Sequence, residues 1–342
     1  MIAKRNIIPV FVPHLGCPNN CVFCNQRKIS GNSTTATAET VKYAVQDGMG
    51  KIPENSNIQL AFYGGSFTAI PVGEQNELLD AALPFLHDGR ISSLRLSTRP
   101  DAIDAQTLVR LKEHGVRTIE LGAQSMCEEV LEASGRGHTT VQTEIAAGLI
   151  KEHGFELVLQ MMTGLPEDTK ERAIETARRI IAMRPDGVRI YPTVIIENTP
   201  LCDMWREGCY KEHTVEEAVE TCTAILPMFE EAEIPVIRLG LNPTEELSGG
   251  AALGGAYHPA FGELVKSRLL LDKARALLKG GTYSDTVTLY VNKSDVSAMI
   301  GQKRSNIEVL CEEFSLKSIK VSPADVQKSS INIIDSKRTY NI

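Results

Sequence analysis

Hydrophobic and polar positions follow two alternating periodicities along most of this chain. Short apolar runs, which predict buried strands, lie at Ile7–Val12, Ile58–Tyr63, Leu94–Ser97, Thr118–Leu121, Glu156–Gln160 and Val188–Tyr191. Stretches with helical spacing lie at Glu39–Asp47, Glu74–Leu86, Gln106–His114, Thr140–His153 and Thr169–Met183. Strands that alternate with helices are typical of βα units. We therefore expect an α/β fold, a (β/α) partial TIM-type barrel of about six βα units.

The pattern changes in the last third of the chain. A helix at Val215–Ala232 and a strand at Val236–Arg238 are expected to complete the barrel, and a helix follows at Glu263–Leu278. From Thr282 onward the pattern predicts strand, helix, turn, helix, strand and strand, a small C-terminal α+β domain. The expected domains are a partial barrel at 1–247, a Gly-rich linker with a connecting helix at 248–281, and the α+β domain at 282–342.

Composition and charge narrow the function classes. The 342 residues are 42% hydrophobic and 23% charged, as in an average globular protein, and the net charge of −7 argues against a chain-wide nucleic-acid surface. The first 31 residues carry four basic and no acidic side chains, so RNA binding, if present, would involve the ends. The N-terminal apolar run is broken by Pro9, too short for a signal peptide. We expect a cytoplasmic protein, in which thiols stay reduced.

Three cysteines follow the first predicted strand in the loop Gly16-Cys17-Pro18-Asn19-Asn20-Cys21-Val22-Phe23-Cys24. Thiolates at this spacing can bind one metal centre, but three are one short of a closed zinc or iron–sulfur site. A [4Fe–4S] cluster held by three thiolates leaves one iron open to a small molecule. The alternative is a zinc site completed by His14 or by another distant residue.

The loop resembles the cluster-binding signature of the radical S-adenosylmethionine (SAM) superfamily, with the aromatic Phe23 before the last cysteine. The resemblance implies that Cys17, Cys21 and Cys24 bind a [4Fe–4S] cluster and that SAM chelates its open iron. One electron then cleaves the sulfonium to methionine and a 5′-deoxyadenosyl radical, which abstracts hydrogen from the substrate.

Motifs at later strand ends extend the resemblance. They are Tyr63-Gly64-Gly65-Ser66, Ser97-Thr98-Arg99-Pro100-Asp101, Glu120-Leu121-Gly122-Ala123-Gln124-Ser125, Gly135-Arg136-Gly137-His138 and Gln160-Met161-Met162-Thr163-Gly164. The resemblance implies that SAM is bound by Phe23, Gly64, Gly65, Ser66, Ser97, Gln124, Arg136 and Gln160. Arg136 would lie near the carboxylate of SAM, which suits a guanidinium. Arg189 and Tyr191 end the sixth strand and are substrate-facing candidates.

Within the superfamily, the sequence most resembles the radical SAM part of the Elongator catalytic subunit, which modifies the wobble uridine of tRNA. The similarity runs from about residue 5 to about residue 270. It implies an enzyme that modifies RNA, with tRNA as the substrate and an electron donor such as flavodoxin or ferredoxin. The chain has no room for Elongator's acetyltransferase domain, so we expect none and do not carry over the use of acetyl-coenzyme A.

The C-terminal domain contains Ile300-Gly301-Gln302-Lys303-Arg304-Ser305-Asn306-Ile307, which resembles the I-G-x-x-G-x-x-I turn of KH domains. In those domains the turn clamps a nucleic-acid backbone. The resemblance implies RNA contacts by Gly301, Lys303 and Arg304. Because Arg304 replaces the second glycine, charge would carry the contact to phosphate. The alternative is a small α+β cap with a solvated basic turn.

Two other functions fit the same motifs. One is a radical SAM oxidoreductase acting on a small molecule, similar to oxygen-independent coproporphyrinogen oxidase, with the C-terminal domain as a lid. The other is a non-catalytic RNA-binding protein that keeps a vestigial metal loop. The remaining cysteines fit no cluster spacing and are expected to be structural, namely Cys127, Cys202, Cys209, Cys222 and Cys311.

Overall fold

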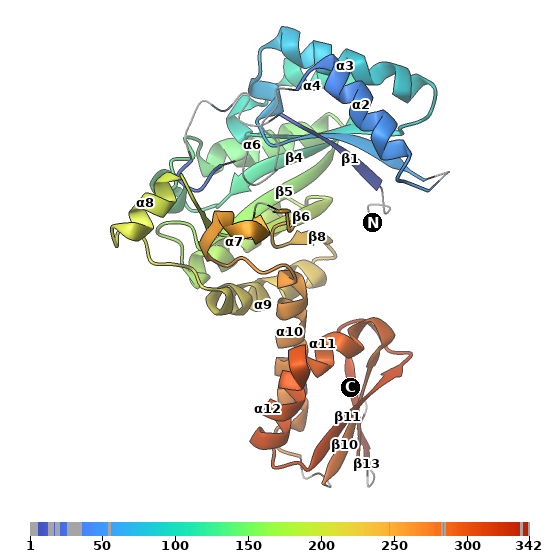
Figure 1. The fold of residues 1–342 in the computed structure, drawn as a ribbon, viewed down its shortest axis with the longest axis vertical. Coiled ribbons are helices and arrows are strands. Elements are labelled where there is room, and N and C mark those ends of the chain that lie inside the picture. The colour runs from blue at the N-terminus through green and yellow to red at the C-terminus, as the bar shows by residue number, and fades with distance from the viewer. Residues whose placement is uncertain are drawn as a thin grey trace. The chain divides into compact units, whose positions relative to one another are not determined.

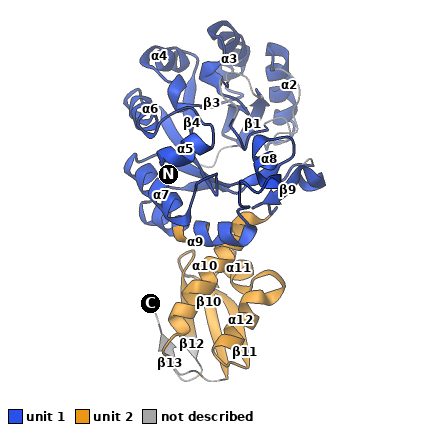
Figure 2. Ribbon diagram, turned by 90° about the vertical axis from the view of Figure 1, so that its left-hand side faces the viewer, with its two compact units in different colours: residues 1–221, 225–259 blue, residues 222–224, 260–342 orange. Residues whose placement is uncertain are grey.

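The computed structural model describes residues 6–12, 17, 21–25, 36–53, 56–245, 247–281, 283, 285–335 and 338–340 (Figure 1). Its contacts divide the chain into two compact units (Figure 2). The first unit comprises residues 1–221 and 225–259, and the second comprises residues 222–224 and 260–342.

The first unit is built on one curved sheet of parallel strands in the order β1-β2-β3-β4-β5-β6-β8. The strands are β1 (Asn6–Phe11), β2 (Ile58–Tyr63), β3 (Ser93–Thr98), β4 (Val116–Gln124), β5 (Glu156–Thr163), β6 (Gly187–Pro192) and β8 (Val236–Leu239). Most of their side chains are buried on both faces, which explains why they appear in the sequence as apolar runs. The predicted partial barrel is confirmed as a seven-stranded half-barrel.

Helices connect the strands, and the longer ones lie around the outside of the curved sheet (Figures 1 and 2). They are α2 (Ala38–Met49), α3 (Val72–His87), α4 (Ala105–Glu113), α5 (Glu128–Ala133), α6 (Thr140–Glu152), α7 (Lys170–Ala182), α8 (Pro200–Arg206) and α9 (Val215–Glu231). Several begin at a side-chain cap. Thr139 and Gln142 form a reciprocal capping box on α6, and Thr214 and Glu217 form one on α9.

The Gly-rich segment predicted as a linker belongs to the first unit. Residues Leu247–Ala251 form a π-type turn, and β9 (Ala252–Gly255) pairs antiparallel with β7 (Val194–Ile196). Gly255 has a φ of +81°, and a Cβ there would lie 2.7 Å from the carbonyl oxygen of Thr193, so only glycine fits. The glycines therefore allow close strand pairing, and the boundary between the units lies at Pro259–Ala260.

The second unit packs three helices against a small sheet. Helix α10 (Phe261–Leu278), predicted as a connector, buries Leu270, Leu271, Ala274 and Leu278 in this unit's own core. The other elements are β10 (Thr286–Asn292), α11 (Val296–Ile300), α12 (Ser305–Glu313), β11 (Ser318–Ala324), β12 (Ile331–Asp335) and β13 (Arg338–Tyr340). In the sheet order β11-β10-β12-β13, β10 pairs parallel with β11 and antiparallel with β12.

In the part of the chain that the structure describes, no helix combines the length and the apolar character needed to cross a bilayer.

Candidate functional site

One cavity of about 950 Å³ lies on the concave side of the half-barrel and receives side chains from β1 across to β8. Every cluster, cofactor and substrate-facing candidate predicted from the sequence lines it. These are Cys17, Cys21, Phe23, Cys24, Gly64, Gly65, Ser66, Ser97, Gln124, Arg136, Gln160, Arg189 and Tyr191. The candidates come from loops and strands far apart in sequence, and the fold brings them to one space. Their individual roles remain predictions.

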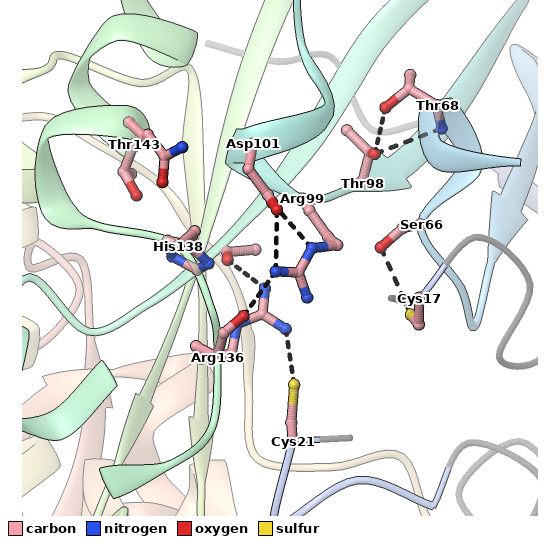
Figure 3. A network of polar contacts seen from close by, with 12 residues as sticks. Cys17, Cys21, Ser66, Thr68, Thr98, Arg99, Asp101, Arg136, His138 and Thr143 are labelled. Carbon is pink, nitrogen blue, oxygen red and sulfur yellow. Dashed lines mark hydrogen bonds and ion pairs between the residues drawn. The ribbon is translucent and has the colours of Figure 1, made fainter. Parts of the chain in front are cut away.

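The three cysteines stand at one side of this cavity, and none forms a disulfide. Cys21 is buried, and its segment is held by hydrogen bonds from Val22 N–H to the Ser134 carbonyl and from Leu201 N–H to the Val22 carbonyl. Cys17 is exposed, with Sγ 3.6 Å from Ser66 Oγ (Figure 3). His14, the ligand of the zinc alternative, lies outside the described residues.

The turn after β2 is shaped by its neighbour β3. Gly64 has a φ of +89°, and the hydroxyl of Ser97 lies 3.4 Å from the carbonyl oxygens of both Phe62 and Gly65. Ser97 lines the cavity, and its hydroxyl donates to these backbone carbonyls. Its contribution is to fix the Gly64–Gly65 turn.

Gln124 ends β4 in a backbone conformation that non-glycine residues rarely adopt. Its φ is +64°, a left-handed geometry that costs roughly 1–2 kcal/mol in an L-residue. Its side-chain Oε1 is buried and has no hydrogen-bond partner among the described residues. An unpaired buried acceptor is unfavourable by about 1–3 kcal/mol, so the site calls for a donor that the described residues do not supply. Both the strained backbone and the unpaired Oε1 are typical of a residue that contacts a ligand.

Arg136 reaches the cysteines through a gap left by Gly122. Its Nη1 donates to Cys21 Sγ at 3.3 Å and its Nη2 donates to the Gly122 carbonyl at 2.8 Å (Figure 3). A Cβ on residue 122 would lie 3.2 Å from that Nη2, closer than most side chains tolerate. In this structure the guanidinium predicted near the SAM carboxylate therefore lies against a predicted cluster ligand.

An ion pair between the buried Arg99 and the more exposed Asp101 positions Arg136. Arg99 is 1% exposed, makes two hydrogen bonds to Asp101 at 2.8 and 3.1 Å, and donates from Nη2 to the Arg136 carbonyl at 2.6 Å. His138 follows two residues later, and its Nε2 lies 3.3 Å from the Ala123 carbonyl. Burial, together with the charges of Arg136 and Arg99, lowers the pKa of His138 to about 4, so its imidazole is neutral at pH 7.

A second polar network, centred on Glu120, was not predicted from the sequence. The Glu120 carboxylate is fully buried in β4 and accepts hydrogen bonds from four side chains. The donors and distances are Tyr63 OH at 2.7 Å, Arg95 Nη1 at 2.8 Å, Arg189 Nη2 at 3.0 Å and Gln160 Nε2 at 3.0 Å. Arg189 Nε lies 2.8 Å from the other carboxylate oxygen as part of the ion pair. Burial alone would raise the pKa of Glu120, but Arg189, Arg95 and the Tyr63 hydroxyl hold that pKa below its usual range.

This network engages two of the predicted site residues. Gln160, expected at the SAM ribose, uses its amide N–H on Glu120, and Arg189 makes a two-point ion pair with the same carboxylate. Arg238, which was also missed as a site residue, lines the cavity from β8 opposite Arg189 in the strand register. Charged residues inside short, otherwise apolar strands were the sequence signal that could have identified these site residues.

Two family models match consecutive parts of the chain. A model of the radical SAM superfamily matches residues 11–180, and a model of the Radical_SAM C-terminal domain matches residues 185–270. The chain belongs to the radical SAM superfamily. The matched ranges hold the cysteine loop, the Gln124 and Arg136 motifs, and the Glu120 network.

Curated relatives point to one branch of the superfamily. The chain is 30% identical over 185 residues to "tRNA uridine(34) acetyltransferase" of Methanocaldococcus jannaschii, covering 48% of this chain and 34% of that protein. It is 31% identical over 195 residues to "Elongator complex protein 3" of Homo sapiens, covering 50% and 35%. These alignments span about a third of the length of the relatives and fall on the radical SAM region.

A solved structure agrees with the fold. The archaeal Elp3 of Methanocaldococcus infernus, with its N-terminus deleted, superposes with a TM-score of 0.62 at 23% identity. The match covers 80% of this chain and 64% of that one. The half-barrel of this radical SAM protein is therefore the same fold as the one in that structure.

Members of the radical SAM superfamily use a [4Fe–4S] cluster and SAM, and the residues of this chain fit both groups. Three thiols, the donors of such clusters, line one cavity, and none is consumed in a disulfide. The orphaned Oε1 of Gln124 lies in the same cavity and can accept from an ammonium or hydroxyl group. Three thiols and an unpaired acceptor together form an appropriate donor set.

The predicted RNA-contacting turn lies in the second unit, between α11 and α12. Gly301 has a φ of +78°, and both Lys303 and Arg304 are left-handed, with φ of +50° and +68°. Arg304 therefore adopts the backbone conformation that the glycine of the KH motif would supply. Both basic side chains are exposed. The structure presents two adjacent cations on a tight turn.

Proposed function

We propose that this protein is a radical SAM enzyme that modifies RNA, with tRNA as its substrate. The observation that carries the proposal is the match of the cysteine-bearing half-barrel to relatives named for tRNA uridine(34) modification and for Elongator. The cavity behind this match retains a complete set of candidate ligands for the cluster and for SAM. Acetyl transfer is not included, because the alignments support only the radical SAM region.

Each part of the cavity has a distinct role in this proposal. Bound together, the cluster and SAM supply reductive cleavage of the sulfonium and a 5′-deoxyadenosyl radical. Cys17, Cys21 and Cys24 hold the cluster. The Gly64–Gly65 turn brings backbone close to SAM, and Gln124 accepts a hydrogen bond from it.

The second unit supports an RNA substrate. Lys303 and Arg304 stand exposed on a turn between two helices, where they can approach phosphate without moving other side chains. An electron must come from outside the chain, and we infer a small reductant such as flavodoxin or ferredoxin. The proposed setting is the cytoplasm, where thiols that bind clusters stay reduced.

Two measurements test the proposal. The reconstituted protein, reduced under anaerobic conditions, should release 5′-deoxyadenosine from SAM. Cys21→Ala should abolish that release, whereas Cys209→Ala, which changes an exposed thiol that does not line the cavity, should not. Release by Cys21→Ala would refute the cluster assignment.

Mass spectrometry of tRNA nucleosides should identify the product. Cells that lack the gene should lose one modified nucleoside, and the wild-type gene, but not Cys21→Ala, should restore it. An unchanged nucleoside profile together with active SAM cleavage would point to a small-molecule substrate. A protein that binds the cluster but never cleaves SAM would fit the non-catalytic alternative.

A further inference from the structure

Among the described residues, the side chains around Glu120 carry more positive charge than this one carboxylate can balance. In the part of the chain that the structure describes, Glu120 is the single acidic residue lining the cavity, and it accepts hydrogen bonds from both Arg95 and Arg189. One carboxylate therefore faces two buried guanidinium groups. Among the described residues, neither arginine forms an ion pair with any other acid.

Arg238 adds a third cation on the same side. In the parallel pairing of β6 with β8, Arg238 is the register partner of Arg189. Paired residues of neighbouring strands point to the same face of a sheet, and both side chains line the cavity. Arg238 is half-buried, and among the described residues it has no ion pair or hydrogen-bond partner for its side chain. It remains available to a ligand.

Neither Arg189 nor Arg238 contacts the cysteine loop among the described residues. Arg189 contacts Glu120, Tyr63 and Tyr191 instead. Arg136 stands on the cysteine side, where it contacts Cys21. Glu120 balances only one of the charges of Arg95 and Arg189, and Arg238 adds another. The net positive charge of this group in a low-dielectric cavity favours an anion.

The geometry suits a phosphate group. Neighbouring strands lie about 4.8 Å apart, so two register partners can each place a guanidinium on oxygens of one tetrahedral anion. The Tyr191 hydroxyl, which lies 3.4 Å from Arg189 Nη1, adds a further polar group at the same place. Pro235, Ile237 and Leu241 line the cavity beside Arg238 and offer an apolar wall for a sugar or base.

We propose that Arg189 and Arg238 form a subsite for a phosphodiester group next to the nucleotide that enters the cavity. This inference rests on the proposed RNA substrate and makes it more specific. The RNA would then have two contacts with the protein. The exposed turn with Lys303 and Arg304 would bind its backbone outside the cavity, and the subsite would bind one phosphate inside it. Arg238 would bind this phosphate directly, and Arg189, anchored by Glu120, would hold it in place.

The test compares two dinucleotides that differ only in charge at one position. Uridylyl-uridine with its natural phosphodiester and the same dinucleotide with a neutral methylphosphonate linkage are titrated into the full-length protein, reconstituted and supplied with SAM. We expect the charged dinucleotide to bind at least tenfold more tightly. Arg238→Gln should remove this preference and leave the affinity for the neutral dinucleotide unchanged.

A matched control and a fold check complete the experiment. Arg178→Gln removes an exposed arginine of α7 that is paired with Glu175, and it should keep the full preference. Because Arg238 has no ion pair to lose among the described residues, its variant should keep the wild-type melting temperature. Arg189→Gln should also lose the preference, but with reduced stability, because Glu120 loses a partner.

Three results would overturn the inference. They are equal binding of the two dinucleotides by the wild-type protein, retention of the preference by Arg238→Gln, and stronger competition by a dicarboxylate such as succinate than by the charged dinucleotide. Loss of the subsite with tRNA modification intact would leave the proposed function standing. Preference for the phosphodiester in a protein that modifies no tRNA would remove the proposed function alone.

Discussion

Arg136 donates from Nη1 to the Sγ of Cys21 across 3.3 Å, while its Nη2 donates to the carbonyl of Gly122. A cationic donor beside a thiolate ligand stabilises added negative charge, and hydrogen bonds to sulfur are among the factors that set iron–sulfur potentials. The Arg99–Asp101 pair fixes the backbone of Arg136, so the donor is held in place before any cofactor binds.

Arg136→Gln should therefore lower the reduction potential of the reconstituted cluster. We expect the equilibrium for one-electron reduction to shift about tenfold toward the oxidised form, equivalent to about 59 mV. A redox titration without SAM, followed by electron paramagnetic resonance, measures this potential. Arg117→Gln, a substitution on the surface, is the control and should leave the potential unchanged. If Arg136 serves only the SAM carboxylate, the potential will not change and only SAM affinity will fall.

Glu120 links side chains from three other strands of the half-barrel, namely Arg95, Gln160 and Arg189. Glu120→Ala would leave Arg95 and Arg189 buried without their carboxylate, which typically destabilises a protein by about 3–5 kcal/mol. Urea denaturation should show this loss. Glu175→Ala, which removes an exposed i,i+3 pair with Arg178, should change the free energy of unfolding by less than about 0.5 kcal/mol. Similar values for the two variants would contradict a structural role for the Glu120 network.

The sequence predicted more of the fold than of this network. Strands of a parallel sheet are buried on both faces, so β2 through β6 appear as apolar runs, and their order follows from the alternation with helices. Glu120 and its partners lie 25 to 69 residues apart in the chain. A single sequence carries no signal that pairs such distant residues. Charges inside apolar strands indicate only that some partner exists.

Short elements were missed for a different physical reason. Strand β9 lies in a Gly-rich segment that lacks the β-branched residues from which strands are recognised, and it forms because β7 and the Thr193 carbonyl allow close backbone approach. Helix α8 (Pro200–Arg206) is too short to show a helical period, although Thr199 caps it and Pro200 begins it. Tertiary contacts determine both elements, and no local pattern predicts them.

The buried His138 predicts a dependence of stability on pH. Its pKa is lowered to about 4 in the folded protein, against about 6.5 in an unfolded chain. The unfolded state therefore binds the proton first, so the stabilising contribution is present above pH 6.5 and is lost as pH falls toward 4. We expect His138→Gln to lose about 3 kcal/mol less stability than wild type between pH 7 and pH 4.

Chemical denaturation at a series of pH values measures this difference directly. His87→Gln, a substitution at an exposed histidine near the end of α3, should follow the wild-type curve. Parallel curves for wild type and His138→Gln would show that His138 does not titrate between the two states as the structure indicates.

Gln124 predicts opposite effects on stability and on ligand binding. Gln124→Gly removes both the left-handed strain and the orphaned Oε1, whereas Gln124→Ala removes only the amide. The glycine variant should therefore be more stable than the alanine variant by about 1 kcal/mol. Both should bind SAM about tenfold more weakly, as expected for loss of one buried hydrogen bond of about 1.4 kcal/mol. Unchanged SAM affinity in both variants would show that the amide serves only the fold.

Arg304 combines the same strain with an exposed charge, at the turn between α11 and α12. Its φ of +68° suits glycine, so Arg304→Gly should stabilise the second unit by about 1 kcal/mol. If the turn contacts phosphate, the same variant should bind tRNA more weakly. The slope of log K against log salt should then become shallower by about one unit. Lys317→Gln, which removes an exposed lysine paired with Asp285, serves as the charge-matched control and should keep the wild-type slope. A more stable Arg304→Gly variant with unchanged tRNA affinity and salt slope would place the RNA contact elsewhere. The strained arginine would then contribute nothing to RNA binding.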